Sequence, residues 1–229
     1  VPDPSVGPGM VRLDVEWCGI CGSDLHEFEA HTVSGYAPPI IIGHEFAGTV
    51  AEVGEGVEAV SVGDRVAVEP FLRCNACEAC LADQYHLCPS LTVVGAQATD
   101  GGFAQRAIVP AYAVHVLPAS VPTDVGALVE PLAVGWHALR KGHFSAGQSV
   151  LVIGAGPIGL TSLLCAQAME ASLVAVSVRR AGARAEAASD LGADAVLDSS
   201  ADDVAARIME LTDGRGVDVV IETSGAPEA

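Results

Sequence analysis

Short runs of alternating hydrophobic and polar residues, separated by glycine, proline and aspartate, cover the chain from residue 11 to about residue 116. Residues 11–15 and 65–68 are clear examples. Alternation with a period of two places every second side chain on the same face, as in a half-buried β-strand. We therefore predict a small β-rich, barrel-like domain for this half of the chain.

The pattern changes after Pro122. Thr123 and Asp124 can cap a helix that runs to about Lys141, because Thr and Asp side chains accept hydrogen bonds from the first turn of a helix. Predicted strands then alternate with predicted helices: strands over residues 149–153, 173–178, 195–197 and 217–221, and helices over residues 157–169, 181–191 and 202–211. This alternation indicates a parallel, doubly wound α/β sheet. We predict two domains, 1–145 and 146–229, joined by a crossover near residues 142–147.

The composition limits what the protein can bind. Its 229 residues are 50% hydrophobic, which is enough to bury a core. They carry a net charge of −18, with 29 acidic residues against 11 basic ones. Nucleic acid and anionic membranes repel such a chain, so both are excluded as partners.

One segment is long enough to be mistaken for a membrane span, because no charged residue occurs between residues 144 and 169. Glycines and a proline lie at its midpoint, where they would break a helix: Gly154, Gly156, Pro157 and Gly159. We interpret the segment as a buried strand, a tight turn and a buried helix. The N-terminus has no basic region followed by an apolar one, so we predict a cytoplasmic protein.

Four cysteines form a C-x2-C-x2-C-x7-C run at Cys74, Cys77, Cys80 and Cys88. Tetrahedral zinc takes four thiolates at about 2.3 Å, and two-residue spacers bring them to one point without strain. Protein atoms would fill all four positions, so no position is left for a substrate. The run predicts a structural zinc in a lobe over residues 70–92.

Two alternatives compete with zinc at these cysteines. Pro89 follows Cys88 as in ferredoxin-type iron–sulfur runs, but the last spacer here is seven residues and there is no second run. Disulfides are the other alternative. The total of seven cysteines is odd and nothing indicates export, which fits a reducing cytoplasm better.

A G-x-G-x-x-G motif follows the predicted strand 149–153 and opens the next helix. Its residues are Gly154, Gly156, Pro157, Ile158 and Gly159. In this context the glycines allow a tight turn, let the backbone approach a pyrophosphate and seat the helix on the sheet. Free N–H groups at the helix start then face the phosphates. The alternative is a glycine-rich turn without a ligand.

The end of the next strand decides the choice of cofactor. NAD enzymes usually place Asp or Glu there to bind the ribose 2′-hydroxyl. Here the position holds Val178, followed at once by Arg179 and Arg180. Guanidinium groups suit a 2′-phosphate, so the sequence favours NADP(H) over NAD(H). The alternative is two solvated arginines, with NAD held by the backbone alone.

Three separated fragments carry potential ligands of a second metal: Cys18 to His26, Gly43-His44-Glu45 and Glu130-Pro131-Leu132. One Cys, one His and one carboxylate, with a fourth position open, are the donors of a catalytic zinc. Taken singly, each is ambiguous. A lone His is more often a core or surface residue, and Cys18 and Cys21 could be a redox pair or two small core residues.

Together these motifs resemble the zinc-dependent medium-chain alcohol dehydrogenases, in particular the branch with sorbitol and 2,3-butanediol dehydrogenases. The resemblance rests on Gly19-Ile-Cys-Gly-Ser-Asp-Leu-His26, Gly43-His-Glu-Phe-Ala-Gly48, the four-cysteine run, Glu130-Pro-Leu-Ala-Val134 and the glycine motif. It implies a GroES-like catalytic domain followed by a Rossmann domain. It also implies two zinc ions per chain, one structural and one catalytic.

The resemblance assigns roles by position. It implies that Cys21 and His44 are zinc ligands, that Glu45 is a ligand or an exchanging carboxylate, and that Glu130 binds directly or through water. It implies that Asp24 orients His44, and that Ser23 and His26 carry the proton from the alcohol to solvent. The remaining cysteines and histidines have no such role and are expected not to bind metal: Cys18, Cys165, His31, His86, His115, His137 and His143.

The implied reaction is hydride transfer between a secondary alcohol, diol or polyol and NAD(P)+. Zinc lowers the pKa of a bound hydroxyl from about 16 toward 7, so that an alkoxide forms and releases hydride to the nicotinamide. Three alternatives stay open. They are an L-threonine 3-dehydrogenase-like activity, a non-catalytic NADPH-binding scaffold and a zinc-free quinone reductase on the same fold.

The ends of the chain depart from the family pattern. Val1-Pro-Asp-Pro4 would enter in mid-strand, and residues 217–225 would form the fourth strand of a sheet that ordinarily has six. In the family, the part that follows completes the nicotinamide site and much of the subunit contact. We therefore expect a fragment that does not turn over substrate by itself, from a full-length homodimer or homotetramer.

Overall fold

The computed structural model describes residues 5–30, 40–95 and 99–226, so Val1 to Pro4 and His31 lie outside the described residues. The chain divides into two compact units, Val1–Glu130 and Pro131–Ala229. Each unit has its own core. The predicted domain boundary lies after residue 145, which would place helix α4 (Val129–Lys141) in the first domain. In the structure, the division after Glu130 places most of this helix in the second unit.

The first unit is built on a five-stranded antiparallel sheet, ordered β6-β1-β2-β3-β7. Its strands are β1 (Met10–Gly19), β2 (Glu45–Val53), β3 (Arg65–Val68), β6 (Arg106–Pro110) and β7 (Val114–Val116). Val11 and Leu13, two positions apart on β1, are fully buried and pack with Phe46 of β2. The predicted alternation on β1 therefore marks the face that covers the core.

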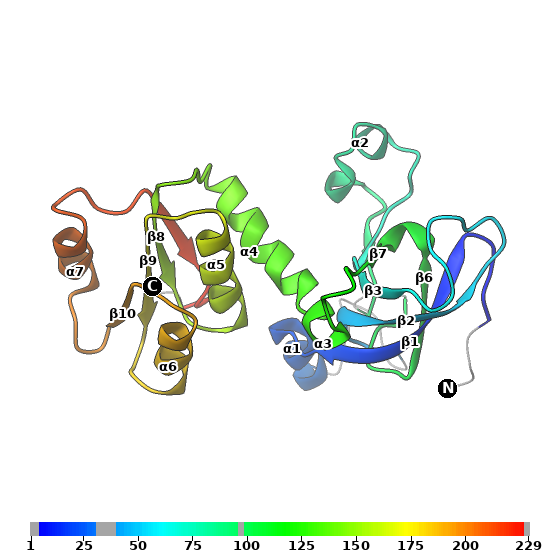
Figure 1. The fold of residues 1–229 in the computed structure, drawn as a ribbon, viewed down its shortest axis with the longest axis horizontal. Helices are drawn as coiled ribbons and strands as arrows, with labels where there is room; N and C mark the ends of the chain where they lie inside the picture. Colours follow the sequence, from blue (N-terminus) through cyan, green and yellow to red (C-terminus); the bar gives the residue numbers. More distant parts are fainter. Residues whose placement is uncertain (1–4, 31–39, 96–98, 227–229) are drawn as a thin grey trace. The chain divides into compact units, whose positions relative to one another are not determined.

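Two parts of this unit stand apart from the sheet (Figure 1). Helix α1 (Gly22–Ala30) follows β1 directly. The segment between β4 (Phe71–Leu72) and β5 (Thr92–Val93), which pair with each other, forms a separate lobe containing α2 (Glu78–Leu81) and the 3-10 turn η1 (Tyr85–Leu87). A second 3-10 turn, η2 (Ala111–Ala113), leads into β7.

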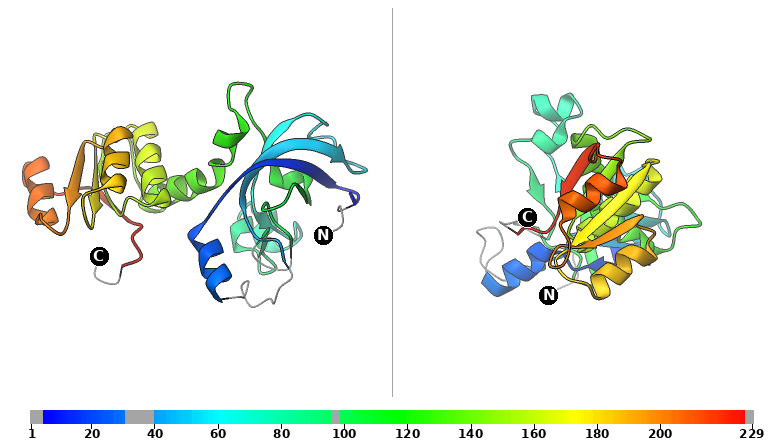
Figure 2. Two further views of the ribbon diagram at one scale, coloured as in Figure 1. Left: turned by 90° about the horizontal axis from the view of Figure 1, so that it is seen from below. Right: turned by 90° about the vertical axis from the view of Figure 1, so that its left-hand side faces the viewer.

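The second unit holds a four-stranded parallel sheet, ordered β10-β9-β8-β11. Its elements follow the predicted alternation: β8 (Ser149–Ile153), α5 (Pro157–Ala168), β9 (Leu173–Val178), α6 (Ala183–Asp190), β10 (Ala195–Asp198), α7 (Val204–Leu211) and β11 (Val219–Glu222). One face packs against α4, α5 and α6 and the other against α7, so the sheet is doubly wound (Figure 2). This confirms the predicted fold class.

The uncharged segment 144–169 forms strand β8, a turn and helix α5, as expected from its glycines. Within the described ranges, no helix is long and apolar enough to cross a membrane.

The prediction of one helix from Thr123 to Lys141 was wrong, because the structure has two helices, α3 (Thr123–Gly126) and α4. Neither predicted capping side chain caps a longer helix: the Thr123 hydroxyl donates to Glu16 at 2.6 Å, and the Asp124 carboxylate accepts from Val125 N at 2.9 Å. Close packing also holds the short helix in place, since a Cβ on Gly126 would lie 2.5 Å from Leu117. These tertiary contacts override the local helix pattern.

Candidate active site and metal centres

Cys21, His44 and Glu45 come together in the first unit although 22 residues separate the first two positions in the printed sequence. One potential ligand atom of each lies within 4.8 Å of the others. Cys21 stands immediately before α1, and His44 and Glu45 stand at the start of β2, where they are 8% exposed. A thiol, an imidazole and a carboxylate thus converge at the point where β1 and β2 meet.

Asp24 lies beside the His44 ring. Its carboxylate is 2% exposed, accepts a hydrogen bond from Cys21 N at 2.8 Å and lies 3.5 Å from His44 Nδ1. The hydrogen bond with the Cys21 thiol and the charge of Asp24 raise the pKa of His44 to about 9, against the effect of burial. The same imidazole lowers the pKa of Cys21. His44 is therefore held between a carboxylate on Nδ1 and a thiol, which fits a metal-binding imidazole.

Glu130 lies near this group without joining it. It is in the first turn of α4 and is half-buried. Burial raises its pKa, the charge of His44 opposes that effect, and the charges of Glu45 and Asp24 add to it. The carboxyl group is thus within electrostatic reach of His44 and Glu45 of this group and of Asp24.

Ser23 and His26 both lie on α1 and both are exposed. Residues three apart on a helix share a face. The Ser23 hydroxyl forms a hydrogen bond with the Cys21 thiol and contributes to lowering its pKa. The two side chains therefore extend from the converging group toward solvent along one helix.

A backbone clasp, formed by residues 100–103, holds the segment that carries His44. Gly101 N, Gly102 N and Phe103 N donate to the carbonyls of Ile41, Gly43 and Ile42 at 2.8, 2.8 and 3.0 Å. The contacts leave no room for side chains, since a Cβ on Gly101 would lie 2.1 Å from Gly43 O and one on Gly102 would lie 2.6 Å from the Phe46 ring. Sequence reasoning missed this clasp, although the Gly-Gly pair at 101–102 was a visible signal.

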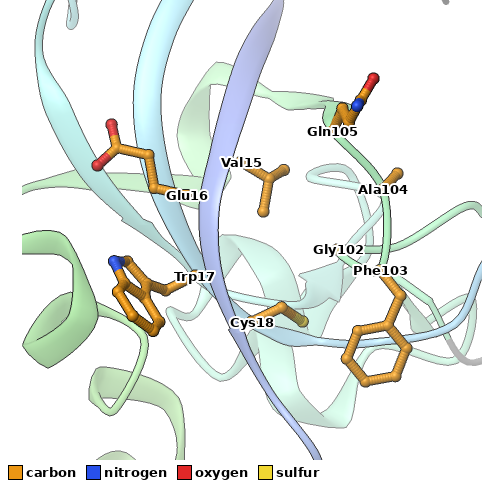
Figure 3. Close-up of a pocket in the computed structure, with 8 residues that line it drawn as sticks. All are labelled: Val15, Glu16, Trp17, Cys18, Gly102, Phe103, Ala104 and Gln105. Carbon is orange, nitrogen blue, oxygen red and sulfur yellow. The ribbon is translucent and has the colours of Figure 1, made fainter.

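A shallow groove of about 460 Å³ runs beside the clasp, between residues 15–18 and 102–105. Figure 3 shows Cys18 and Phe103 on one side of β1 and Trp17 on the other. Burial raises the pKa of the Cys18 thiol to about 12. Cys18 packs against the core of the first unit and does not join the group formed by Cys21.

The four cysteines of the lobe also converge, with all four sulfurs within 4.8 Å of one another. Cys74 Sγ lies 3.9 Å from Cys80 Sγ and 3.6 Å from Cys88 Sγ. Sulfurs bound to one tetrahedral zinc at about 2.3 Å would lie about 3.8 Å apart. Hydrogen bonds from the backbone of Ala76 and Cys77 lower the pKa of Cys74 to about 6, which favours the thiolate. The donor set fits tetrahedral zinc.

Arg73 ties the base of this lobe to the barrel. Its guanidinium lies over the rings of Tyr85, 3.9 Å from the centroid, and Tyr112, at 4.6 Å. It also pairs with Glu69 at 3.8 Å. Cation–π stacking on two rings from different elements fixes the direction in which the lobe leaves the sheet. Nothing in the residue spacing pointed to this arrangement.

The glycine motif forms the predicted turn between β8 and α5. Gly154 has a φ of 100°, in the left-handed region where glycine is favoured, and a Cβ on Gly159 would lie 1.9 Å from Gly154 O. Gly156 is the N-cap of α5 with no side-chain cap, and Pro157 follows at the start of the helix. In the order β10-β9-β8-β11, the chain crosses to the opposite side of β8, so this turn lies at the switch point where dinucleotides bind.

Val178 ends β9 as a buried residue, and Arg179 and Arg180 follow it on the surface. The Asp198 carboxylate at the end of β10 accepts from Ala181 N at 2.8 Å and so anchors the loop that carries both arginines. Sequence reasoning did not include Asp198.

Among the residues expected not to bind metal, those that the structure describes belong to neither group. In the part of the chain that the structure describes, no group of potential ligands includes His86, His115, His137 or His143. The Cys165 thiol is buried and donates to Leu132 O at 3.3 Å. His31 lies outside the described residues.

Comparisons with known proteins agree with this architecture. Residues 7–119 match the model of the alcohol dehydrogenase GroES-like domain, and residues 157–229 match that of zinc-binding dehydrogenases. The 2R,3R-butanediol dehydrogenase of Bacillus subtilis superposes with a TM-score of 0.87 at 38% identity, covering 100% of this chain and 67% of that one. The chain belongs to the zinc-dependent medium-chain alcohol dehydrogenase family.

Relatives within this family carry several activities in their names. L-threonine 3-dehydrogenase of Pyrococcus abyssi is 45% identical over 228 residues, which are 99% of this chain and 65% of the relative. The (R,R)-butanediol dehydrogenase of Neisseria gonorrhoeae is 39% identical over 234 residues, covering 97% and 66%. The chain thus spans about two thirds of the length of the medium-chain dehydrogenases that it matches.

Two solved structures of relatives contain different cofactors. A zinc-binding dehydrogenase of Sinorhizobium meliloti, bound to NADP, has a TM-score of 0.88 and 35% identity and covers 100% of this chain and 66% of its own. An Escherichia coli alcohol dehydrogenase in complex with NADH has a TM-score of 0.85 and 35% identity and covers 98% and 64%. Relatives of similar distance therefore use either dinucleotide.

Proposed function

We propose that the protein containing this chain is a zinc-dependent oxidoreductase that transfers hydride between a secondary alcohol, diol or polyol and NAD(P). The observation that carries this proposal is the convergence of Cys21, His44 and Glu45 in a chain that also forms the glycine turn of a dinucleotide site. One thiol, one imidazole and one carboxylate leave a fourth position for substrate.

The donor chemistry supports two zinc ions per chain. Cys21, His44 and Glu45 would hold the catalytic ion, and Glu130, whose carboxyl group interacts electrostatically with His44 and Glu45, would bind it directly or through water. The structural ion would be held by Cys74, Cys77, Cys80 and Cys88. When bound, the catalytic zinc supplies Lewis acidity toward the alcohol oxygen.

The chain's own residues would orient the site and move the proton. Asp24, whose carboxylate faces His44 Nδ1 at 3.5 Å, would orient the ring, and the clasp of residues 100–103 fixes the backbone before it. The Ser23 hydroxyl would accept the alcohol proton and His26 would pass it to solvent, since both lie on the exposed face of α1.

For the cofactor we propose a preference for NADP(H) over NAD(H). Val178 ends the strand where an acidic residue would bind a 2′-hydroxyl, and Arg179 and Arg180 follow on the surface. Their guanidinium groups suit a 2′-phosphate. The pyrophosphate of either dinucleotide would bind at the glycine turn and the start of α5. The residues that form this turn are Gly154, Gly156, Pro157, Ile158 and Gly159.

An L-threonine 3-dehydrogenase-like activity is the second candidate. It is favoured by the 45% identity to a relative of that name, against 39% for a butanediol dehydrogenase. For the full-length protein we further propose a homodimer or homotetramer in the cytoplasm. The odd total of seven cysteines supports a reducing compartment.

The test is a panel of diols, polyols and L-threonine, assayed on the full-length protein with NAD+ and NADP+ and combined with metal analysis. We expect two zincs per chain, activity lost on chelation and a higher kcat/KM with NADP+. Activity that survives chelation would favour a zinc-free reductase instead, and one zinc without activity would favour a scaffold. A preference for NAD+ would refute only the cofactor assignment.

A further inference from the structure

The loop after β11 contacts the glycine turn directly. The parallel register pairs Glu222 with Ile153, so Thr223 is the first residue past the last pair. Thr223 N donates to Ile153 O at 2.8 Å. Its hydroxyl lies 2.9 Å from Ile153 O and 3.1 Å from Gly154 O. One side chain thus bonds both carbonyls that lead into the turn.

The Thr223 hydroxyl also fills the space inside the turn. It lies 3.0 Å from the place where a Cβ on Gly154 would be and 2.9 Å from that on Gly159. Gly154 O itself lies only 1.9 Å from the Cβ position of Gly159. The first and last glycines of the motif therefore close around one carbonyl and one hydroxyl.

The Thr223 contact also affects how the glycine turn would interact with the pyrophosphate of a dinucleotide. Carbonyl oxygens at the end of β8 repel a pyrophosphate, whereas the free N–H groups at the start of α5 attract it. The hydroxyl that donates to the Ile153 and Gly154 carbonyls offsets part of their negative charge, so these oxygens would repel an anion less. The hydroxyl thereby supports the polarity of the turn as well as its shape.

The loop that carries Thr223 is itself held by Glu222. The Glu222 carboxylate accepts hydrogen bonds from Ser224 N at 2.6 Å, Ser224 Oγ at 2.5 Å and Gly225 N at 3.2 Å. These bonds stabilise the carboxylate charge within the loop and lower the pKa of Glu222. The hydrogen bond from the Ser224 hydroxyl makes the largest contribution. Thr223 is therefore presented by an ordered local network rather than by a free chain segment.

We propose that Thr223 is a positioning residue for the dinucleotide: its hydroxyl fixes the Ile153 and Gly154 carbonyls and holds the glycine turn in the shape that receives the pyrophosphate. The inference rests on the proposed function, since it assumes that the turn binds a dinucleotide. It predicts a contribution that does not depend on the 2′-phosphate, because the contacts involve only the backbone of the turn.

The test compares three variants of the full-length protein with the unchanged protein, using NADPH, NADH and ADP as probes. Thr223→Val keeps the shape of the side chain but loses the donor, and Thr223→Ser restores the donor. Thr212→Val is the matched control in the same unit. It removes a hydroxyl that donates to Ile208 O at 2.7 Å and makes no contact with the glycine turn.

We expect Thr223→Val to weaken all three probes by about tenfold, corresponding to about 1.4 kcal/mol, and to speed amide exchange in residues 154–159 of the nucleotide-free protein. Thr223→Ser should recover affinity to within about threefold. Thr212→Val should lower the melting temperature without changing the dissociation constants.

Unchanged affinity in Thr223→Val would overturn the inference, and so would an equal loss in Thr212→Val, which would show a general effect of lost stability. If the unchanged protein bound none of the probes, the proposed function would fail, and the inference with it. Faster exchange without weaker binding would show that Thr223 stabilises the turn but does not position the ligand.

Discussion

At the scale of single residues, the candidate site depends on neighbours that restrict His44 from several directions. Asp24 faces its Nδ1, Cys21 bonds the ring, and the clasp of residues 100–103 fixes the backbone of the preceding segment. Glu45, the next residue, is buried with it at the start of β2. A donor held in this way needs little reorganisation to bind a metal.

Replacing one residue of each proposed metal centre should separate their roles. His44→Ala is expected to abolish activity and remove about one zinc while the melting temperature changes little. Cys77→Ser should mainly destabilise the protein, because a structural zinc contributes directly to folding. Activity, zinc content and thermal unfolding of the full-length variants check this. If both variants lost only stability, the assignment of two different zincs would be wrong.

The clasp makes a prediction about Gly102. A Cβ there would lie 2.6 Å from the Phe46 ring, which is 1% exposed and cannot move freely. Gly102→Ala should therefore lower the free energy of unfolding by about 1–3 kcal/mol, measured by urea denaturation. Gly22→Ala is the control, because nothing lies within 4 Å of its Cβ position. An equal effect of both changes would contradict the proposed crowding.

His115 provides a prediction of pH dependence. The hydrogen bond that His115 Nε2 donates to the Glu69 carboxylate, at 3.4 Å, raises the pKa of His115 above its usual 6.5. Since the folded-state pKa is the higher one, the imidazolium stabilises the fold fully below about pH 6.5 and loses this effect as the pH rises through the folded-state value.

The measurement is the difference in unfolding free energy between the unchanged protein and His115→Gln. We expect it to be largest below pH 6.5 and to decline as the pH rises through the raised folded-state pKa of His115, and to stay small because the pair is partly exposed. The same substitution in a Glu69→Gln background should show no such change with pH. A difference in unfolding free energy that grows as the pH rises would contradict the proposed role of the His115 imidazolium.

At the scale of elements, Arg73 and the two helices α3 and α4 show how tertiary contacts act on local segments. The sequence from Thr123 onward favours one helix, yet Glu16 engages Thr123 and close packing holds Gly126. The lobe likewise receives its direction from Arg73, which stacks on Tyr85 and Tyr112. In each case residues distant in the sequence decide how an element begins or is held.

Arg73→Lys tests the role of this stacking in the four-cysteine lobe. A lysine keeps the charge but lacks the planar group that covers two rings. We expect zinc to pass from the lobe to a chelator several-fold faster than in the unchanged protein, followed with a colorimetric zinc indicator. Arg207→Lys, on the surface of α7, should leave the rate unchanged. Equal rates in all three proteins would show that the stacking does not support the metal centre.

At the scale of the whole molecule, the two compact units divide the proposed chemistry. The first holds both candidate metal centres, and the second holds the dinucleotide turn. A strand order with its switch point beside β8 places the glycine turn, the Arg179–Arg180 loop and Thr223 at the carboxyl ends of neighbouring strands. Under the proposed function, cofactor selection would therefore depend on residues of the second unit.

Replacing Arg179 and Arg180 together by Ala should weaken binding of NADPH by about tenfold or more and leave NADH nearly unchanged, because the guanidinium groups would meet only the 2′-phosphate. Arg184→Ala, an exposed arginine on the following helix, is the control. Equal losses for both cofactors would show that the pair does not select NADP(H).

Much of this architecture could be predicted from local patterns. The strands at 149–153 and 173–178 match β8 and β9 at both ends, because short, largely apolar runs that alternate with helices identify buried parallel strands. The four-cysteine spacing likewise predicted a convergence that the structure shows. The break between α3 and α4 and the Arg73 stack were not predictable, since each depends on a partner far along the chain. The Gly-Gly pair at 101–102 signals a close backbone approach but does not identify residues 41–43 as its partner.

By itself, the sequence determined the types of donor, their local spacing and the alternation of strands and helices, because these follow from residue chemistry and from periodicities over a few positions. Only the tertiary structure decided that Cys21 meets His44, that residues 100–103 clasp residues 41–43, and that Thr223 closes the glycine turn. Such contacts arise from the order and register of the strands, and hydrogen bonds between distant segments leave no periodic trace in the sequence.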